Sequence, residues 1–490
     1  MISAKYVEEK YTHYFFDDVN IDFTQVYQVL DAYGLSETLQ YTPLINDPEF
    51  MKVNYYDGHD LGSTYYPDYT VFKVWAPTAL EVKVMVKKNH EFISYDMKRV
   101  ENGVFSLYLS GDYDNCEYLY QVRHHDSFIN ALDPYAYSSS ANGRSSIIID
   151  LNKCMIDLNR QYLKPLKQKT DAILYELSVR DFTMYENSPS KHKGKFLGVS
   201  EAGLITKHGN NAGLDYLVNL GITHVQLMPI FDFATVDENQ PHLLYNWGYD
   251  PAQYNVPEGS YCSDPNDGYS RVLECKEMIA RLHRHGLRVI MDVVYNHMYD
   301  VNASPFERIV PGYYFRKNMD GTLSNGSWCG NDLESCNYMV RKYIIDMSRR
   351  WQSFYGVDGY RFDLMGIIDI ETINQVYQIC HSYDKSFMVY GEGWNMPTSL
   401  PDDQKAMQFN HYKMPNISFF NDEFREVIKG GSSDGVLVNK GFITGNLYET
   451  ERARNCIMAC NRYTSPDQSI NYVECHDNAT IFDKLYISNV

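Results

Sequence analysis

Two hydrophobic patterns follow one another along the chain. Between residues 68 and 150, apolar positions alternate with polar ones, and Val82, Val84 and Val86 are the clearest series. A period of two is typical of a half-buried strand, and Gly, Asp and Asn turns separate the runs. We therefore expect a small β-sandwich over residues 61–165. The weakly patterned residues 1–60 form an N-terminal extension before it.

After about residue 169, short apolar runs replace the alternation, and helical patterns lie between several of them. Val340, Tyr343, Ile344 and Met347, for example, share one face of a predicted helix. Buried strands that alternate with helices predict a parallel sheet. Seven candidate strands favour a (β/α)8 TIM barrel over residues 166–490, so the predicted fold class is α/β. The strands are expected within residues 172–177, 222–230, 287–294, 357–362, 387–390, 416–420 and 470–475.

The predicted barrel lacks its last strand. After the seventh candidate strand, only a loop and a short helix fit before Val490. An open barrel leaves unpaired edges at its first and seventh strands. We therefore expect a missing C-terminal segment or a complementing chain as a partner.

Composition narrows the classes of protein to consider. With 44% hydrophobic and 22% charged residues, the chain has enough apolar surface for a packed core. A net charge of −19 argues against a nucleic acid partner, because an acidic surface repels phosphates. No run approaches the roughly 18 apolar residues that span a bilayer, and no signal peptide is visible, so we expect no membrane partner and a cytoplasmic location. The ten scattered cysteines fit free thiols in a reducing compartment, and the 43 tyrosines would suit sugar contacts.

Carboxylates follow several of the predicted strands. Asp363, Glu392 and Asp477 come after three different strands, and barrel chemistry gathers at the C-terminal strand ends. Glycoside hydrolases act with a pair of carboxylates, which lie about 5–5.5 Å apart when configuration is retained. Arg361 lies two residues before Asp363, so both side chains point the same way and the charges would pair. Glu392 stands between two glycines, where a drier setting would raise its pKa.

Four sequence blocks carry a family resemblance. Residues 292–297, 356–366, 391–394 and 473–478 resemble the conserved blocks of the α-amylase superfamily, in their usual order. Residues 245–251, YNWGYDP, are similar to the signature of type I pullulanases. The sandwich, with Val-Trp-Ala-Pro at 74–77 and Asp-Pro-Tyr-Ala at 133–136, resembles the carbohydrate-binding modules that precede debranching enzymes.

The resemblance implies a role for each matching residue. Asp363 matches the nucleophile, Glu392 the general acid/base and Asp477 the stabiliser of the transition state. Asp292 would orient its neighbours. The implied substrate-binding residues are His297, Arg361 and His476 as hydrogen-bonding groups, Tyr249 as an aromatic platform, and Trp247 and Trp394 as stacking or wall residues.

The implied activity is a retaining hydrolase that cleaves α-1,6 branch linkages in pullulan, starch, glycogen or limit dextrins. No cofactor is implied, and the residues around Asn296 form no recognisable metal-ligand loop. A non-catalytic α-glucan-binding fragment and an isoamylase-like debranching enzyme remain the alternatives. Trp75 is expected in the core of the sandwich. Trp328 would either line a sugar-binding groove or belong to the core.

Overall fold

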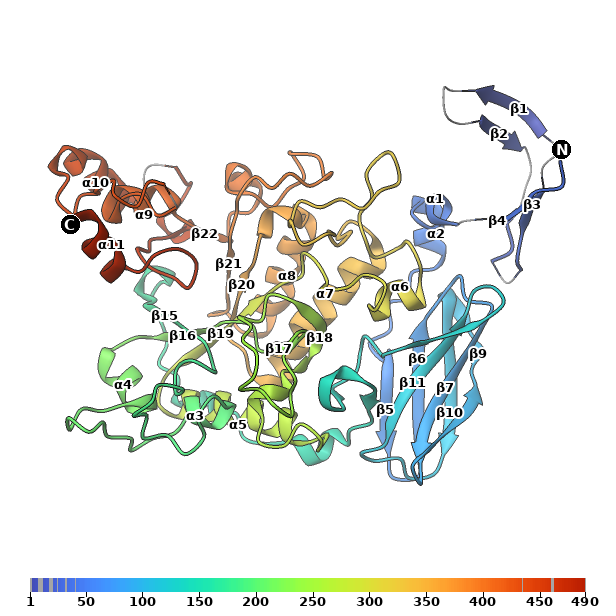
Figure 1. Cartoon of the computed structure of the whole chain (residues 1–490), viewed down its shortest axis with the longest axis horizontal. Helices are drawn as coiled ribbons and strands as arrows, with labels where there is room; N and C mark the ends of the chain where they lie inside the picture. The colour runs from blue at the N-terminus through green and yellow to red at the C-terminus, as the bar shows by residue number, and fades with distance from the viewer. Residues whose placement is uncertain are drawn as a thin grey trace.

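The computed structural model describes residues 2–7, 12–16, 21–23, 25–30, 33–39, 41–433, 435–459 and 462–489. The N- and C-termini lie at opposite ends of the molecule, with a sandwich and a larger α/β body between them (Figure 1). In the N-terminal extension, strand β1 (Ile2–Val7) pairs with β2 (Thr12–Phe16), and β3 (Gln28–Leu30) pairs with β4 (Ser36–Thr38). Two short helices follow, α1 (Thr42–Ile45) and α2 (Pro48–Val53).

The sandwich is built from two antiparallel sheets. One sheet has the order β5 (Gly62–Tyr66), β6 (Tyr69–Trp75), β10 (Val104–Ser110) and β9 (Lys98–Arg99). The other has the order β13 (Ser138–Ser139), β14 (Ser146–Ile147), β11 (Glu117–Arg123), β7 (Glu81–Lys88) and β8 (Glu91–Asp96), and β12 (Phe128–Ala131) also pairs with β11. The alternation seen in the sequence places Val82, Val84 and Val86 in the core, because successive side chains of a strand point to opposite faces. Trp75, expected in this core, is buried instead against the barrel body, with its ring 4.9 Å from that of Tyr313 and 6.3 Å from that of Tyr314. Its indole N–H donates to the backbone oxygen of Asn54 at 2.8 Å.

The larger body is a curled sheet of seven parallel strands. Their order is the order of the chain, which is typical of a (β/α) barrel that lacks its closing strand. The strands are β15 (Leu174–Leu177), β16 (His224–Leu227), β19 (Arg288–Val293), β20 (Gly359–Phe362), β21 (Met388–Gly391), β22 (Ser418–Phe420) and β23 (Ser469–Ile470). The last strand is much shorter than the apolar run at 470–475 predicts. It pairs only through Ser469 and Ile470, so the residues after them form a loop.

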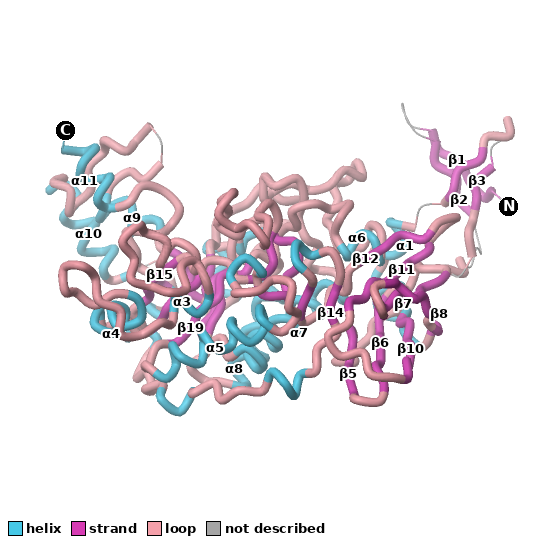
Figure 2. Tube along the Cα trace, turned by 60° about the horizontal axis from the view of Figure 1, so that its bottom comes forward, coloured by secondary structure: helices cyan, strands magenta, loops and turns pink. Residues whose placement is uncertain are grey.

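Helices cover the outside of this sheet, and Figure 2 shows the sandwich strands and the barrel strands as two separate groups. The main helices are α4 (Gly213–Leu220), α5 (Ser270–Arg284), α7 (Tyr338–Arg350) and α8 (Ile370–Tyr383). Shorter elements are α3 (Phe196–Val199), α6 (Pro305–Ile309) and the antiparallel pair β17 (Phe231–Phe233) and β18 (Pro251–Pro257). Near the C-terminus lie α9 (Asp422–Lys429), α10 (Thr450–Ile457) and α11 (Ile481–Asn489).

The sandwich packs against the barrel through the segment that joins them. Arg350 of α7 donates to the backbone oxygen of Tyr135 at 2.7 Å, and its guanidinium lies 3.9 Å from the ring centroid of Tyr137. Ser138 donates to the backbone oxygen of Gly268 at 2.7 Å. Buried residues of both parts belong to one continuous hydrophobic core. None of the helices in the described ranges combines the length and the hydrophobicity that a bilayer-spanning helix requires.

Candidate active site

One buried cation organises the carboxylates at the C-terminal ends of the barrel strands. Arg361 of β20 is almost fully buried, and its Nη1 donates to Asp292 Oδ1 at 3.0 Å and to Asp363 Oδ1 at 2.8 Å. Its Nη2 lies 2.7 Å from Glu392 Oε1. β20 lies between β19 and β21, so the strand register brings the three acids to one guanidinium. Asp363 and Glu392 therefore become close neighbours, as a glycosidase pair requires.

Asn296 fixes the second oxygen of Asp363. Its side-chain amide donates to Asp363 Oδ2 at 2.9 Å and to the Asp363 backbone oxygen at 2.8 Å. The amide oxygen of Asn296 accepts from His297 Nδ1 at 2.5 Å. Asp363 thus has its side chain held from two sides, by Arg361 and by Asn296. Sequence reasoning considered Asn296 only as a metal ligand, although it lies in the same block as His297.

Glu392 has the environment of a proton donor. Burial raises its pKa, Arg361 opposes this, and the charges of Asp363 and Asp477 raise it further, so that the pKa lies above its usual value. The backbone N–H of Leu364 also donates to Glu392 Oε2 at 3.0 Å. A raised pKa favours the protonated form of a carboxyl group, which is the form that can protonate a leaving oxygen.

Asp292 lies beneath the pair and is fully buried. Burial raises its pKa to about 7, while Arg361 counteracts the effect. The hydroxyl of Tyr249 donates to Asp292 Oδ2 at 2.7 Å. Asp292 therefore connects the aromatic residue Tyr249 to the cation that holds the two reactive carboxylates.

His476 and Tyr249 form an aromatic stack next to these acids. Their rings stack with centroids 5.1 Å apart, and Trp247 approaches His476 edge-on at 5.4 Å. Both the backbone N–H and Nδ1 of His476 contact Glu176 Oε1, at 2.5 Å and 3.0 Å. Burial lowers the pKa of His476, but the bond to Glu176 more than compensates, and the pKa is raised. Sequence reasoning missed Glu176, which lies on β15 at the other edge of the sheet.

The remaining predicted residues lie around this centre. His297 is buried, burial lowers its pKa, and its Nε2 has no hydrogen-bond partner in the described part of the chain, which leaves a polar atom for a ligand. Trp394 packs against the small cluster that contains Tyr390 and Phe420. Asp477 is exposed in the loop after β23, and its charge still reaches Glu392. The structure therefore brings the predicted set together, with Asp477 and Trp247 at its outer edge.

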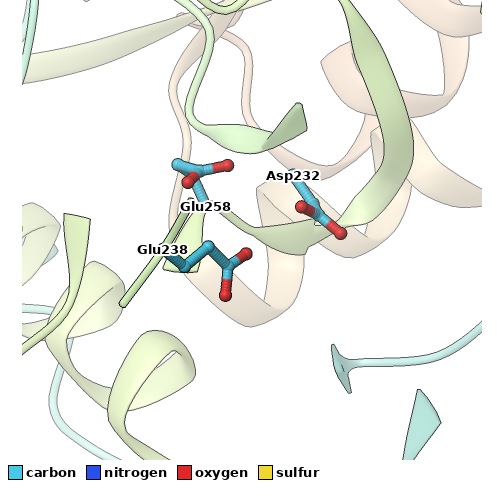
Figure 3. A group of neighbouring side chains, drawn as sticks. All are labelled: Asp232, Glu238 and Glu258. Atoms are coloured by element: carbon cyan, nitrogen blue, oxygen red, sulfur yellow. The ribbon is translucent and has the colours of Figure 1, made fainter. Parts of the chain in front are cut away.

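A second group of acids lies away from this centre. Asp232, Glu238 and Glu258 are buried, and one oxygen or more of each lies within 4.8 Å of the others (Figure 3). Arg271, also buried, forms an ion pair with Glu238 at 2.6 Å. Burial, followed by the charge of Glu238, raises the pKa of Glu258 to about 7, and burial raises that of Asp232 strongly. Carboxylate oxygens are the ligands that hard cations prefer. In this structure, Arg271 already places one positive charge beside the three acids. Sequence reasoning missed it because the three residues follow no metal-ligand spacing.

Comparison with known proteins finds matches for both the sandwich and the barrel. A family model described as carbohydrate-binding module 48 (isoamylase N-terminal domain) matches residues 60–136, and a model of the alpha amylase catalytic domain matches residues 200–317. Pullulanase from Bacillus subtilis (strain 168) is 40% identical over 98% of this chain, which covers 67% of that protein. Chloroplastic pullulanase 1 from Arabidopsis thaliana is 33% identical over 87% of this chain, which covers 54% of it.

A crystal structure of pullulanase from Anoxybacillus sp. LM18-11, complexed with maltotriose, superposes with a TM-score of 0.95 at 41% identity. The match covers 100% of this chain and 70% of the other. The type I pullulanase of Bacillus subtilis str. 168, complexed with maltose, gives a TM-score of 0.93 at 39% identity and is covered to 69%. The chain thus spans between about half and 70% of the length of these relatives.

Proposed function

Because the chain belongs to the pullulanase family, we propose that it is a glycoside hydrolase that cleaves α-1,6-glucosidic linkages in pullulan, starch, glycogen or limit dextrins. Neutral sugars suit a chain of net charge −19, since binding then depends on stacking and hydrogen bonds. The observation that carries the proposal is the single guanidinium of Arg361 that joins Asp363 to Glu392.

In the proposed reaction, a carboxylate oxygen of Asp363 attacks the anomeric carbon of the glucosyl unit. Glu392 gives its proton to the glycosidic oxygen, and the bond between that oxygen and the anomeric carbon breaks. A covalent glycosyl ester on Asp363 remains. Glu392, now ionised, takes a proton from water, and the hydroxide oxygen displaces Asp363 from the same carbon. Two inversions give net retention of configuration.

The other residues would hold the sugar and the charge that develops on it. Tyr249 and His476 offer a stacked aromatic face, and the unpartnered Nε2 of His297 can meet a sugar hydroxyl. Asp477 carries a negative charge near Glu392 and would stabilise the oxocarbenium-like transition state. Trp247 and Trp394 would form the walls of the binding site.

Product analysis on pullulan tests the linkage. Maltotriose as the product supports α-1,6 cleavage, whereas panose-like products would contradict it. Asp363→Asn should abolish release of reducing sugar and still bind maltotriose, because the amide keeps the shape but cannot act as a nucleophile. Asp96→Asn, on the exposed surface of the sandwich, is the matched control and should leave activity unchanged. Turnover by Asp363→Asn would refute the assignment of the nucleophile, and binding without turnover by the unmodified chain would favour a non-catalytic α-glucan-binding role.

We also propose that a further segment or a complementing chain covers the open side of the sheet. β15 and β23 each pair with one neighbour in the barrel sheet, and a cavity of about 470 Å³ lies between them, lined by Leu174, Phe420 and Ile470 among others. Unpaired edges of buried sheets are normally covered. Hydrogen exchange at the backbone amides of β15 should be fast in this chain and slow once the partner is bound. Equal protection in both states would contradict the proposal.

A further inference from the structure

The loop at residues 324–332 presents Trp328 beside the candidate active site. Asp332, fully buried at the base of this loop, accepts from the backbone N–H groups of Gly326 at 2.8 Å and Ser327 at 2.9 Å. The Ser327 hydroxyl donates in turn to the backbone of residue 331 at 2.6 Å. A buried carboxylate that accepts several backbone bonds fixes the path of the loop, because leaving it unpaired would be costly.

The same loop is joined to the strand end that carries His297. The buried amide of Asn331 donates to the backbone oxygen of Met298 at 2.7 Å and accepts from the Met298 N–H at 3.0 Å. The N–H of Leu333 donates to the backbone oxygen of Asn296 at 2.8 Å. Since Asn296 also holds Asp363, the loop and the nucleophile candidate share one rigid support.

Trp328 itself stands in a conformation that has a cost. Its φ of 61° lies in the left-handed region, which costs an L-residue other than Gly or Asn roughly 1–2 kcal/mol. The side chain is 71% exposed, so packing in the hydrophobic core does not compensate. A strained, exposed aromatic residue on a firmly bonded loop is typical of a binding position.

The tip of the loop lies within electrostatic range of the active-site acids. Burial raises the pKa of the adjacent Cys329 thiol, and the charges of Asp363 and Asp250 raise it further. The side chain next to Trp328 therefore lies near the proposed nucleophile. This supports the placement that the bonds to Asn296 and Met298 already indicate.

We infer that Trp328 stacks on a glucosyl ring away from the cleavage point and so favours longer α-glucan chains. This inference rests on the proposed function, because it assumes an α-glucan in the site. The flat indole offers apolar area to a sugar face, and its N–H donates to no acceptor in the described part of the chain. A rigid support means that little conformational entropy is lost when the sugar binds.

Calorimetric binding of maltose and maltotetraose to the 490-residue chain tests this role. Trp328→Ala should weaken maltotetraose binding by about tenfold and leave maltose binding within about twofold, since only the longer sugar reaches the loop. Trp328→Phe should bind maltotetraose within about threefold of the unmodified chain, because a ring is retained. Met319→Ala, at a neighbouring turn where the side chain is even more exposed, is the control and should change neither affinity.

The possible outcomes distinguish failure of the stacking role of Trp328 from failure of the proposed hydrolysis. If Trp328→Ala binds maltotetraose as tightly as the unmodified chain, or weakens both sugars equally, the stacking role is refuted. If the unmodified chain binds neither sugar, the role is refuted as well. If the chain binds maltotetraose with the expected dependence on Trp328 but releases no product from pullulan, the hydrolytic proposal fails and the binding role stands.

Discussion

Replacing Arg361 by lysine keeps the positive charge but removes the fork of donors that joins three acids. Arg361 has contacts of 3.0, 2.8 and 2.7 Å with Asp292, Asp363 and Glu392. A single ammonium on a flexible chain cannot reproduce this planar arrangement. Each charge-assisted hydrogen bond contributes about 1.5–3 kcal/mol. If two of the three are lost in the transition state, the barrier rises by about 3–6 kcal/mol.

At about 1.4 kcal/mol for each factor of ten, kcat/KM on pullulan should fall by roughly 10²–10⁴ in Arg361→Lys. Maltotetraose binding should change far less, because Tyr249 and His476 keep their stacking. Steady-state kinetics on pullulan and calorimetric titration with maltotetraose measure the two effects, and a thermal unfolding curve verifies that the variant is folded.

Arg180→Lys is the matched control, because Arg180 pairs with Asp181 in a more exposed setting outside the carboxylate group. Its kcat/KM should stay within about threefold of the unmodified chain, as is usual for exposed ion pairs. If Arg361→Lys also stays within about threefold, the guanidinium does not organise the reactive carboxylates, and the reasoning from its geometry is wrong.

Three further predictions concern Glu392, Glu258 and the ion pair between Arg271 and Glu238. Glu392→Gln should lower kcat on pullulan by about 10²–10⁴, the usual contribution of a general acid, with maltotetraose binding retained in calorimetry. The raised pKa of Glu258, about 7 against an ordinary 4.5, means that its contribution to stability is present below about pH 4.5 and is lost as the pH rises through 7. The free energy of unfolding, measured by urea titration from pH 4.5 to 8, should therefore fall less steeply in Glu258→Gln, and an unchanged slope would contradict this. Arg271→Met should cost about 3–5 kcal/mol at pH 7 because it leaves buried carboxylates without their cation, and the double variant with Glu238→Gln should recover part of the loss in the same titration. Equal stability of the single and double variants would show that the pair is not coupled.

Much of the fold follows from local pattern. The runs around residues 287–294 and 357–362 are rich in apolar residues, and the structure has the fully buried strands β19 and β20 there. The charged residues within them, such as Asp292 and Arg361, pair with each other. The run at 470–475 also contains several apolar residues, yet only Ser469–Ile470 forms a strand. Pairing depends on a neighbouring strand, and the sequence of one segment does not say how far that neighbour extends.

Site residues could be predicted from the sequence where a reactive residue type comes at the end of a predicted strand. Arg361 and Asp363 share a face because they lie two residues apart at the end of β20, and their 2.8 Å contact follows from that spacing. Glu176 gave no such signal, since its partner His476 is 300 residues away along the chain. The group around Glu258 also gave no such signal, because Asp232 on β17 and Glu258 after β18 meet only through the pairing of these two strands.

The contact between Glu176 and His476 also has a consequence for how the protein is made. It joins the first strand of the barrel to the loop that follows the seventh, across 300 residues. Bringing such distant segments together costs loop-closure entropy before their contact can form. Contacts between segments far apart in the sequence therefore slow folding. His476 and its neighbour Asp477 can therefore reach their positions only after the whole sheet has curled. During synthesis on the ribosome, the nascent barrel would remain without its complete set of site residues until this last contact forms.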